Sequence, residues 1–178
     1  MADYVELDRR FRDAAHGSDS ETTALLSYAA SLSHADTGLS WAEVLTHRLV
    51  VVLGEPGSGK TAEFKAQARL PDPSGTPRFF VRLDDLIQGS LNSALGSEHA
   101  KRFQRWLNGS GEAAFFLDSV DESKYRCNDD FAHALERIAS ELGKSFPRAR
   151  IAISSRISEW QPQTDKDTVL RVFGLPSA

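Results

Sequence analysis

The feature that most constrains the fold of this chain is the stretch GEPGSGKT, residues 54–61, directly behind the apolar run LVVVL at 49–53. The stretch fits the pattern G-x-x-x-x-G-K-[ST] at every fixed position. The run before it predicts a strand buried on both faces, and the residues that follow, TAEFKAQARL, predict a helix. A glycine-rich loop between a buried strand and a helix turns successive N–H groups towards phosphate oxygens. The sequence therefore predicts a phosphate-binding loop rather than a glycine turn with a chance lysine.

Each part of this loop has an expected role in holding a nucleotide. Gly57 and Gly59 let the backbone turn, and the helix that follows contributes the partial positive charge of its N-terminus. The Lys60 ammonium neutralises the β- and γ-phosphates, and the Thr61 hydroxyl coordinates Mg²⁺. The predicted nucleotide-binding residues are Gly54, Glu55, Pro56, Gly57, Ser58, Gly59, Lys60 and Thr61, and Thr61 is also a predicted metal ligand.

A second motif, FFLDSVDES at 115–123, supplies carboxylates. Its apolar residues end at Asp118, which places this carboxylate at the carboxyl end of a buried strand, where open α/β sheets bind ligands. We expect Asp118 to hold Mg²⁺. Asp121 and Glu122 follow within reach of an attacking water, and we predict that they are catalytic, because a base there orients and deprotonates the water. The alternative is a solvated acidic loop, which the phosphate-binding loop elsewhere in the chain disfavours.

A third motif, SSR at 154–156, ends the apolar stretch ARIAIS. A polar residue and an arginine that leave a buried strand on this edge of the sheet can sense a γ-phosphate and neutralise transition-state charge. We therefore predict a catalytic role for Arg156. The alternative is an ordinary exposed arginine.

Apolar runs and helical patterns alternate along the rest of the chain, which predicts βαβ units, hence a parallel sheet covered by helices. The expected strands are 49–53, 79–83, 113–118, 149–155 and 168–173. The fold class is therefore α/β with a five-stranded parallel sheet.

The first 40 residues are expected to form a short helical extension before a nucleotide-binding core at 41–178. Leu25, Tyr28 and Leu32 recur at helical spacing in this extension. Ser40, followed three residues later by Glu43, matches a capping box at the start of the core.

Composition excludes several classes of function. The net charge is −4 and no basic stripe occurs, so nucleic-acid binding is not supported. No apolar run approaches the roughly 18 residues that a membrane span needs. The charged N-terminus, MADYVELDRRFRD, does not resemble a signal peptide, and the only cysteine, Cys127, forms no internal disulfide. These observations favour a cytoplasmic protein. The five histidines are scattered, which disfavours a metal site made of protein ligands alone.

Taken in order, GEPGSGKT, RFFVRLDDL, FFLDSVDES and IAISSR resemble the NTPase core of the NACHT group, within the STAND branch of P-loop ATPases related to AAA+ proteins. The acidic motif of that group is similar to residues 118–122, with Ser119 where glycine is commoner. Its sensor strand typically ends in Thr-Ser-Arg-Pro, whereas this chain has Ile157 in place of the proline. The resemblance covers about residues 40–175.

The resemblance implies the strand order 5-1-4-3-2, with the sensor strand between the phosphate-loop strand and the Asp118 strand. It implies ATP as the nucleotide, Mg²⁺ as its ion, and a slow ATPase that acts as a molecular switch in innate immune or antiphage signalling. It also implies a helical lid, a winged helix and a repeat-built sensor, through which such proteins self-assemble. The 178 residues leave no room for these regions, so we expect a shortened form or a disrupted gene product.

Two other functions are compatible with a phosphate-binding loop. One is an interaction module that nucleotide stabilises without turnover. The other is a small-molecule kinase, which would need an arginine-bearing lid and an acceptor pocket that the sequence does not show.

Overall fold

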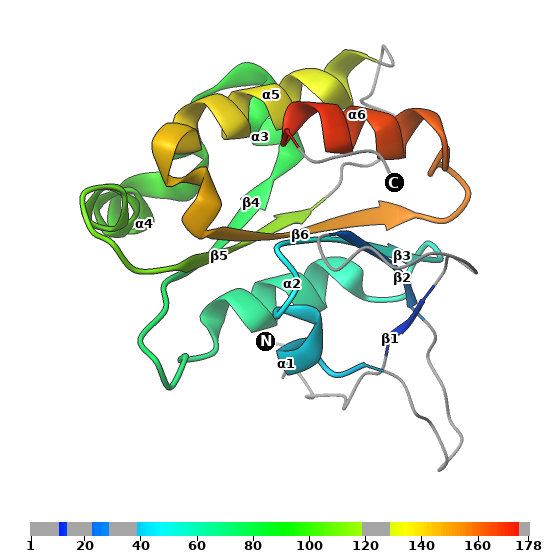
Figure 1. The fold of residues 1–178 in the computed structure, drawn as a ribbon, viewed down its shortest axis with the longest axis horizontal. Helices are drawn as coiled ribbons and strands as arrows, with labels where there is room; N and C mark the ends of the chain where they lie inside the picture. The colour runs from blue at the N-terminus through cyan, green and yellow to red at the C-terminus, as the bar shows by residue number, and fades with distance from the viewer. Residues whose placement is uncertain (1–10, 14–22, 29–38, 119–128, 175–178) are drawn as a thin grey trace.

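The computed structural model describes residues 11–13, 23–28, 39–118 and 129–174, which form an α/β fold around a six-stranded sheet (Figure 1). The strands, in the spatial order β1-β2-β3-β6-β5-β4, are β1 (Phe11–Asp13), β2 (Thr23–Tyr28), β3 (Leu49–Gly54), β6 (Ala149–Arg156), β5 (Ala113–Asp118) and β4 (Arg78–Arg82). The helices are α1 (Trp41–Val44), α2 (Lys60–Arg69), α3 (Leu83–Gln88), α4 (Leu91–Leu107), α5 (Asp129–Leu142), the 3₁₀ helix η1 (Gly143–Arg148) and α6 (Thr164–Val172).

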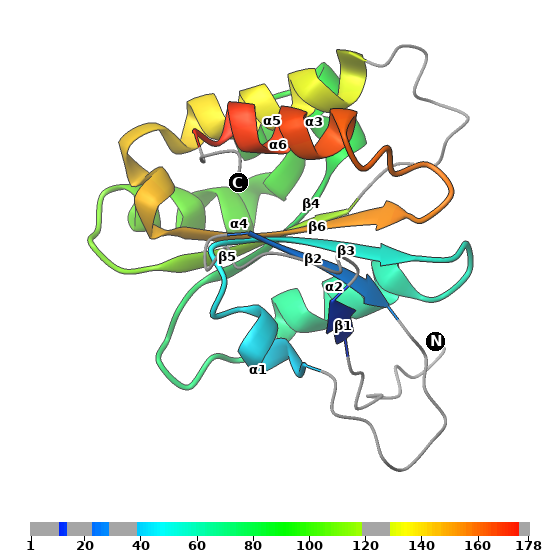
Figure 2. The ribbon, with the colours of Figure 1, turned by 45° about the vertical axis from the view of Figure 1, so that its right-hand side comes forward.

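Helices cover both faces of the sheet. Figures 1 and 2 show α1 and α2 on one face, and α3, α5 and α6 on the other. Alternate residues of β3 face the two sides, as the period of a strand requires. Val51 belongs to the apolar cluster under α3–α6, and Val50 and Val52 belong to the cluster under α1 and α2. Burial on both faces explains why residues 49–53 read as a continuous apolar run.

Four strands from residues 41–178 form an all-parallel core. Numbered along the chain, they lie in the order 1-4-3-2, with β6 between β3 and β5, as the resemblance implies. Because these strands are parallel, their carboxyl ends share one edge of the sheet. In the register of the ladder Gly54 lies beside Arg156, and Asp118 lies beside Arg82.

The prediction of a fifth parallel strand at 168–173, and with it the order 5-1-4-3-2, is wrong. These residues fall in α6 and at its C-cap. Val169, Leu170 and Phe173 are the buried residues of this stretch, a spacing that belongs to one face of a helix rather than to a strand. Two acidic residues in the first turn and Arg171 in the last turn complement the helix dipole.

The predicted N-terminal helix is also wrong where the structure describes it. Residues 23–28 form β2, which pairs in parallel with β3 from Thr23 beside Leu49 to Ser27 beside Leu53. Strand β1 pairs antiparallel with β2, and Phe11 forms a bridge with Leu39. The N-terminal segment therefore extends the sheet beyond β3. The rest of that predicted helix lies outside the described residues.

The predicted capping box is confirmed at the entrance to the core. Ser40 accepts a hydrogen bond from the Glu43 N–H, and the Glu43 carboxylate accepts one from the Ser40 N–H at 2.7 Å. In the part of the chain that the structure describes, no helix is long and apolar enough to cross a membrane.

Candidate phosphate-binding site

The loop from β3 to α2 has the backbone conformation that a phosphate cradle requires. Gly57 has φ 75° and Gly59 has φ 84°, both in the left-handed region that side chains other than glycine rarely adopt. Gly59 is the N-cap of α2, and with no side chain it places no oxygen over the first turn. The first N–H groups of a helix lack partners within the helix, so this end of α2 suits an anion.

Lys60, the first residue of α2, folds its side chain back over the loop. Its ammonium donates to the carbonyl oxygens of Gly54 at 2.6 Å and Glu55 at 2.9 Å, and to the Ser58 hydroxyl at 3.3 Å. Burial lowers the pKa of Lys60 below its ordinary value and the nearby charge of Arg156 lowers it further, whereas Asp118 and Glu55 act in the opposite direction. The Lys60 charge is thus held inside the loop and close to both an arginine and a carboxylate.

Asp118 ends β5 and is 4% exposed. Its Oδ1 accepts a hydrogen bond from the hydroxyl of Ser154 on β6 at 2.9 Å, and Ser154 is fully buried. A carboxylate fixed by a neighbouring strand keeps one orientation towards the end of the sheet. Ser154, the first residue of the SSR motif, therefore orients Asp118.

These side chains meet in one cavity of about 460 Å³, a size within the range of small-molecule sites. Three basic side chains (Lys60, Lys65 and Arg156) and the Asp118 carboxylate line it, together with Pro56, Gly57, Ser58, Gly59, Thr61, Ala62 and Ser154. Positive charge is in excess among these described lining residues, and a concave surface of that charge favours a polyanion. Residues 56–61 of the loop, Asp118 and Arg156 are thus brought together, whereas Gly54 and Glu55 are not among the lining residues.

Lys65 is a charged lining residue that sequence reasoning missed. It lies four residues after Thr61 on α2, and residues at that spacing share a face of a helix. Its ammonium lies 5.3 Å from the centre of the Phe80 ring, a cation–π distance. The helical spacing from Thr61 is the signal that could have identified it.

Thr61 and Asp118 fit a magnesium ion. A hydroxyl and a carboxylate are the hard oxygen donors that Mg²⁺ takes, and its remaining positions usually hold water and substrate phosphate oxygens. Among the described residues, no group of three or more His, Cys, Asp or Glu side chains could hold an ion by itself. The donor set therefore suits an ion that arrives with a phosphate ligand.

Arg156, the last residue of β6, reaches the cavity from the strand beside β3. Its Nη1 lies 3.6 Å from Oε1 of Glu159. The two other predicted catalytic residues, Asp121 and Glu122, lie outside the described residues, three and four positions after Asp118.

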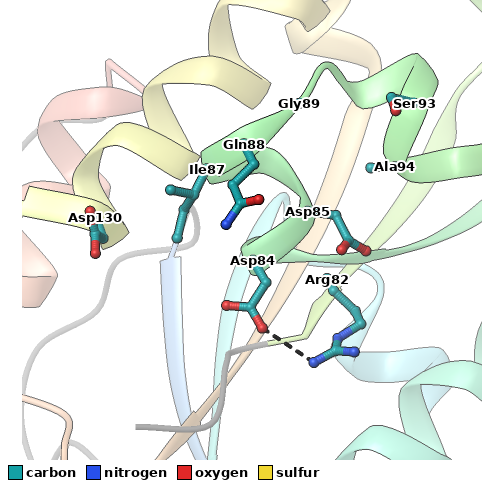
Figure 3. Close-up of a pocket in the computed structure, with 9 residues that line it drawn as sticks. All are labelled: Arg82, Asp84, Asp85, Ile87, Gln88, Gly89, Ser93, Ala94 and Asp130. Carbon is teal, nitrogen blue, oxygen red and sulfur yellow. Dashed lines mark hydrogen bonds and ion pairs between the residues drawn. The ribbon is translucent and has the colours of Figure 1, made fainter. Parts of the chain in front are cut away.

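A second cavity, of about 510 Å³, lies between the end of β4, α3 and the start of α5 (Figure 3). Among the described residues that line it, Asp84, Asp85 and Asp130 are acidic and Arg82 is the one cation. Arg82 pairs with Asp84 at 3.2 Å. Because carboxylates predominate there, this cavity is less suited to a phosphate than the smaller one.

Comparison of the chain with protein-family models, with curated proteins and with solved structures found no match in any of the three.

Proposed function

We propose that this chain binds ATP with Mg²⁺ and hydrolyses it slowly, as the nucleotide-binding core of a molecular switch similar to those of the NACHT group. The observation that carries the proposal is the convergence of Lys60, Asp118 and Arg156 on one cavity. They come from three elements that the parallel sheet and its loop bring to one edge. A glycine turn with a chance lysine would not require a buried carboxylate and an arginine at the same place.

In this proposal the phosphates lie over the loop and the start of α2. The Lys60 ammonium, which now bonds loop carbonyls, turns to the β- and γ-phosphate oxygens, and the first N–H groups of α2 bind the α- and β-phosphates. Thr61 and Asp118 hold Mg²⁺, which when bound neutralises charge on the phosphates. Adenine as the base, rather than guanine, rests on the family resemblance.

Hydrolysis requires a water in line with the γ-phosphate. The water oxygen forms a bond to the γ-phosphorus, the bond to the β–γ bridging oxygen breaks, and the products are ADP and phosphate. Glu122, with Asp121 beside it, accepts the proton of the water. Arg156 stabilises the negative charge on the γ-phosphate oxygens. Slow turnover is expected from the resemblance, because in switches of this kind a conformational closure completes the site.

The wider role follows from the resemblance alone. We propose a cytoplasmic switch in innate immune or antiphage signalling, which assembles with further copies through regions C-terminal of the core.

The test of nucleotide binding is Lys60→Ala, measured by calorimetry with ATP and MgCl₂. A charge-assisted phosphate contact contributes about 1.5–3 kcal/mol, so affinity should fall by at least about tenfold. Lys101→Ala on α4 is the matched control, because it removes an exposed lysine away from the cavity. Equal ATP affinity in the Lys60 variant and the control, with both folded by circular dichroism, would refute the binding site.

Turnover is tested separately by phosphate release. Glu122→Gln should leave ATP affinity nearly intact and slow hydrolysis by about 10²–10⁴-fold, the usual effect of a lost general base. If neither Glu122→Gln nor Asp121→Asn changes a measurable rate, these carboxylates are not the base. If the unmodified chain binds ATP and releases no phosphate above background, it is a nucleotide-stabilised interaction module. ADP formation that requires a phosphoryl acceptor and is not matched by phosphate release would indicate a kinase.

A further inference from the structure

The turn that follows β6 fixes the position of Glu159 relative to Arg156. The carbonyl oxygen of Arg156 accepts hydrogen bonds from the N–H groups of Glu159 at 3.2 Å and Trp160 at 3.0 Å. Trp160 is 7% exposed and packs in the apolar cluster under α3–α6, which anchors the far end of the turn. The backbone therefore holds Glu159 directly beside the arginine that lines the phosphate cavity.

The Glu159 carboxylate has an unusual environment. Its Oε1 is buried, and no hydrogen-bond donor of the described part of the chain meets it. The Arg156 Nη1 is 3.6 Å away, which is too long for a hydrogen bond and close enough for an ion pair. A buried carboxylate oxygen is unfavourable without compensation, so the attraction between the two charges holds the guanidinium near Glu159.

This ion pair restricts Arg156 at the wall of the cavity. The side chain of Arg156 is 23% exposed and that of Glu159 is 32% exposed, so water screens the pair less than it would a fully exposed one. Arg156 also lies close enough to lower the pKa of Lys60, which places its charge beside the phosphate-loop lysine. An arginine held in this way is already ordered before a ligand arrives.

We infer that Glu159 is a positioning residue, which holds the Arg156 guanidinium at the place where the γ-phosphate of ATP binds. The inference rests on the proposed function and adds to it the reason for the arginine's orientation. Ordering a long side chain at the moment of binding weakens affinity by about two- to tenfold. ADP has no γ-phosphate, so the effect of Glu159 is confined to triphosphates.

The experiment compares the affinities of adenylyl imidodiphosphate, a slowly hydrolysed ATP analogue, and of ADP, both with MgCl₂. Glu159→Gln keeps the shape of the side chain and removes its charge. It should weaken analogue binding by about two- to tenfold and change ADP binding less than about twofold. Glu136→Gln is the matched control, because it removes a carboxylate that pairs with Arg171 at 3.2 Å, outside the cavity. Glu159→Asp, which shortens the side chain, should show the same loss of analogue affinity with little change in ADP affinity. This variant replaces Glu159→Gln in the test if Glu159→Gln does not fold.

A double-mutant comparison shows whether Glu159 acts through the arginine. In an Arg156→Ala background, Glu159→Gln should cause no further loss of analogue affinity, because the group that it positions is absent. An equal loss in that background would overturn the inference, as would unchanged or tighter analogue binding in the single Glu159 variant. The proposed function fails separately, through unchanged binding in Lys60→Ala.

Discussion

Replacing Trp41 with phenylalanine tests how α1 is attached to the phosphate-loop helix. The Trp41 Nε1–H donates to Oε1 of Glu63 on α2 at 2.7 Å, and the two residues are 9% and 3% exposed. A hydrogen bond to a charged group contributes about 1.5–3 kcal/mol. The rings of Phe11, Phe64 and Phe116 meet the indole edge to face. The smaller phenylalanine ring leaves a cavity among them, and this cavity costs roughly another 1 kcal/mol.

The expected loss is therefore about 2.5–4 kcal/mol in the free energy of unfolding. For a chain of this size it lowers the melting temperature by roughly 5–15 °C. Urea unfolding followed by circular dichroism measures the loss without relying on tryptophan fluorescence. Gln67 still donates to the same Glu63 oxygen at 3.3 Å, so the carboxylate keeps a donor and the variant should still fold.

Trp160→Phe is the matched control for this experiment. It removes the same atoms from a buried indole whose N–H meets no acceptor in the described part of the chain. The difference between the two variants isolates the hydrogen bond to Glu63. If Trp41→Phe costs no more than Trp160→Phe, or costs as much in a Glu63→Leu background as in the original chain, the bond does not stabilise the fold and the reasoning is refuted.

Three further changes test other parts of the structure. Hydrogen bonds from Ser74 and Arg78 lower the pKa of Asp72 to about 2; Asp72→Asn should therefore cost about 1 kcal/mol at neutral pH, after allowance for solvent screening. Because the pKa of Asp72 is depressed in the folded state, the original chain should exceed the variant in free energy of unfolding by the full amount above about pH 4. This difference should vanish as the pH falls through about 2, as measured by urea titrations. Gly57→Ala places a Cβ where nothing lies within 4 Å, on a residue with φ 75°. Backbone strain alone should therefore lower the free energy of unfolding by about 1–2 kcal/mol. An unchanged free energy of unfolding would mean that the loop adopts another conformation. Asp118→Asn should weaken ATP binding with MgCl₂ and leave binding in EDTA nearly unchanged by calorimetry; equal losses in both would place Asp118 outside the metal site.

The sequence predicts the strand, glycine turn and helix of residues 49–69 well because local and tertiary requirements agree there. Residues 49–54 are buried on both faces of the sheet and could form little other than a central strand. Gly57 and Gly59 adopt positive φ values, as the predicted turn requires. The Ser40–Glu43 capping box depends only on residues three apart, so local sequence determines it.

The two wrong predictions, a strand at 168–173 and a helix that includes 23–28, occur where the apolar residues fit both the helical and the strand period. The stretch TVLRVF at 168–173 is rich in β-branched residues, yet α6 buries Val169, Leu170 and Phe173 on one face, in the apolar layer above the sheet. Residues 23–28 contain apolar residues at helical spacing, yet they pair with β3. In both places tertiary partners, which a single sequence does not reveal, decide the structure.

The position of Glu159 beside Arg156 could not be predicted for a related reason. The pair depends on a turn that has two hydrogen bonds to the Arg156 carbonyl and that ends at Trp160, which is buried under α3–α6. Ile157, which stands where the similar group has proline, is exposed in that turn. The missing proline therefore does not keep Arg156 from the cavity.

Strand β2 takes the place beside β3 that the predicted order gives to a fifth, C-terminal strand. A strand as buried as β3 requires partners for its N–H and C=O groups on both sides, because an unpaired edge in the interior is unfavourable. Strand β6 supplies one side from Leu49 to Gly54, and β2 supplies the other along Leu49 to Leu53. Since the N-terminal segment provides this partner, residues 168–173 are not needed in the sheet and can pack as a helix against α5. The phosphate loop thus begins from a strand that is hydrogen-bonded on both sides, which gives the cradle a rigid support.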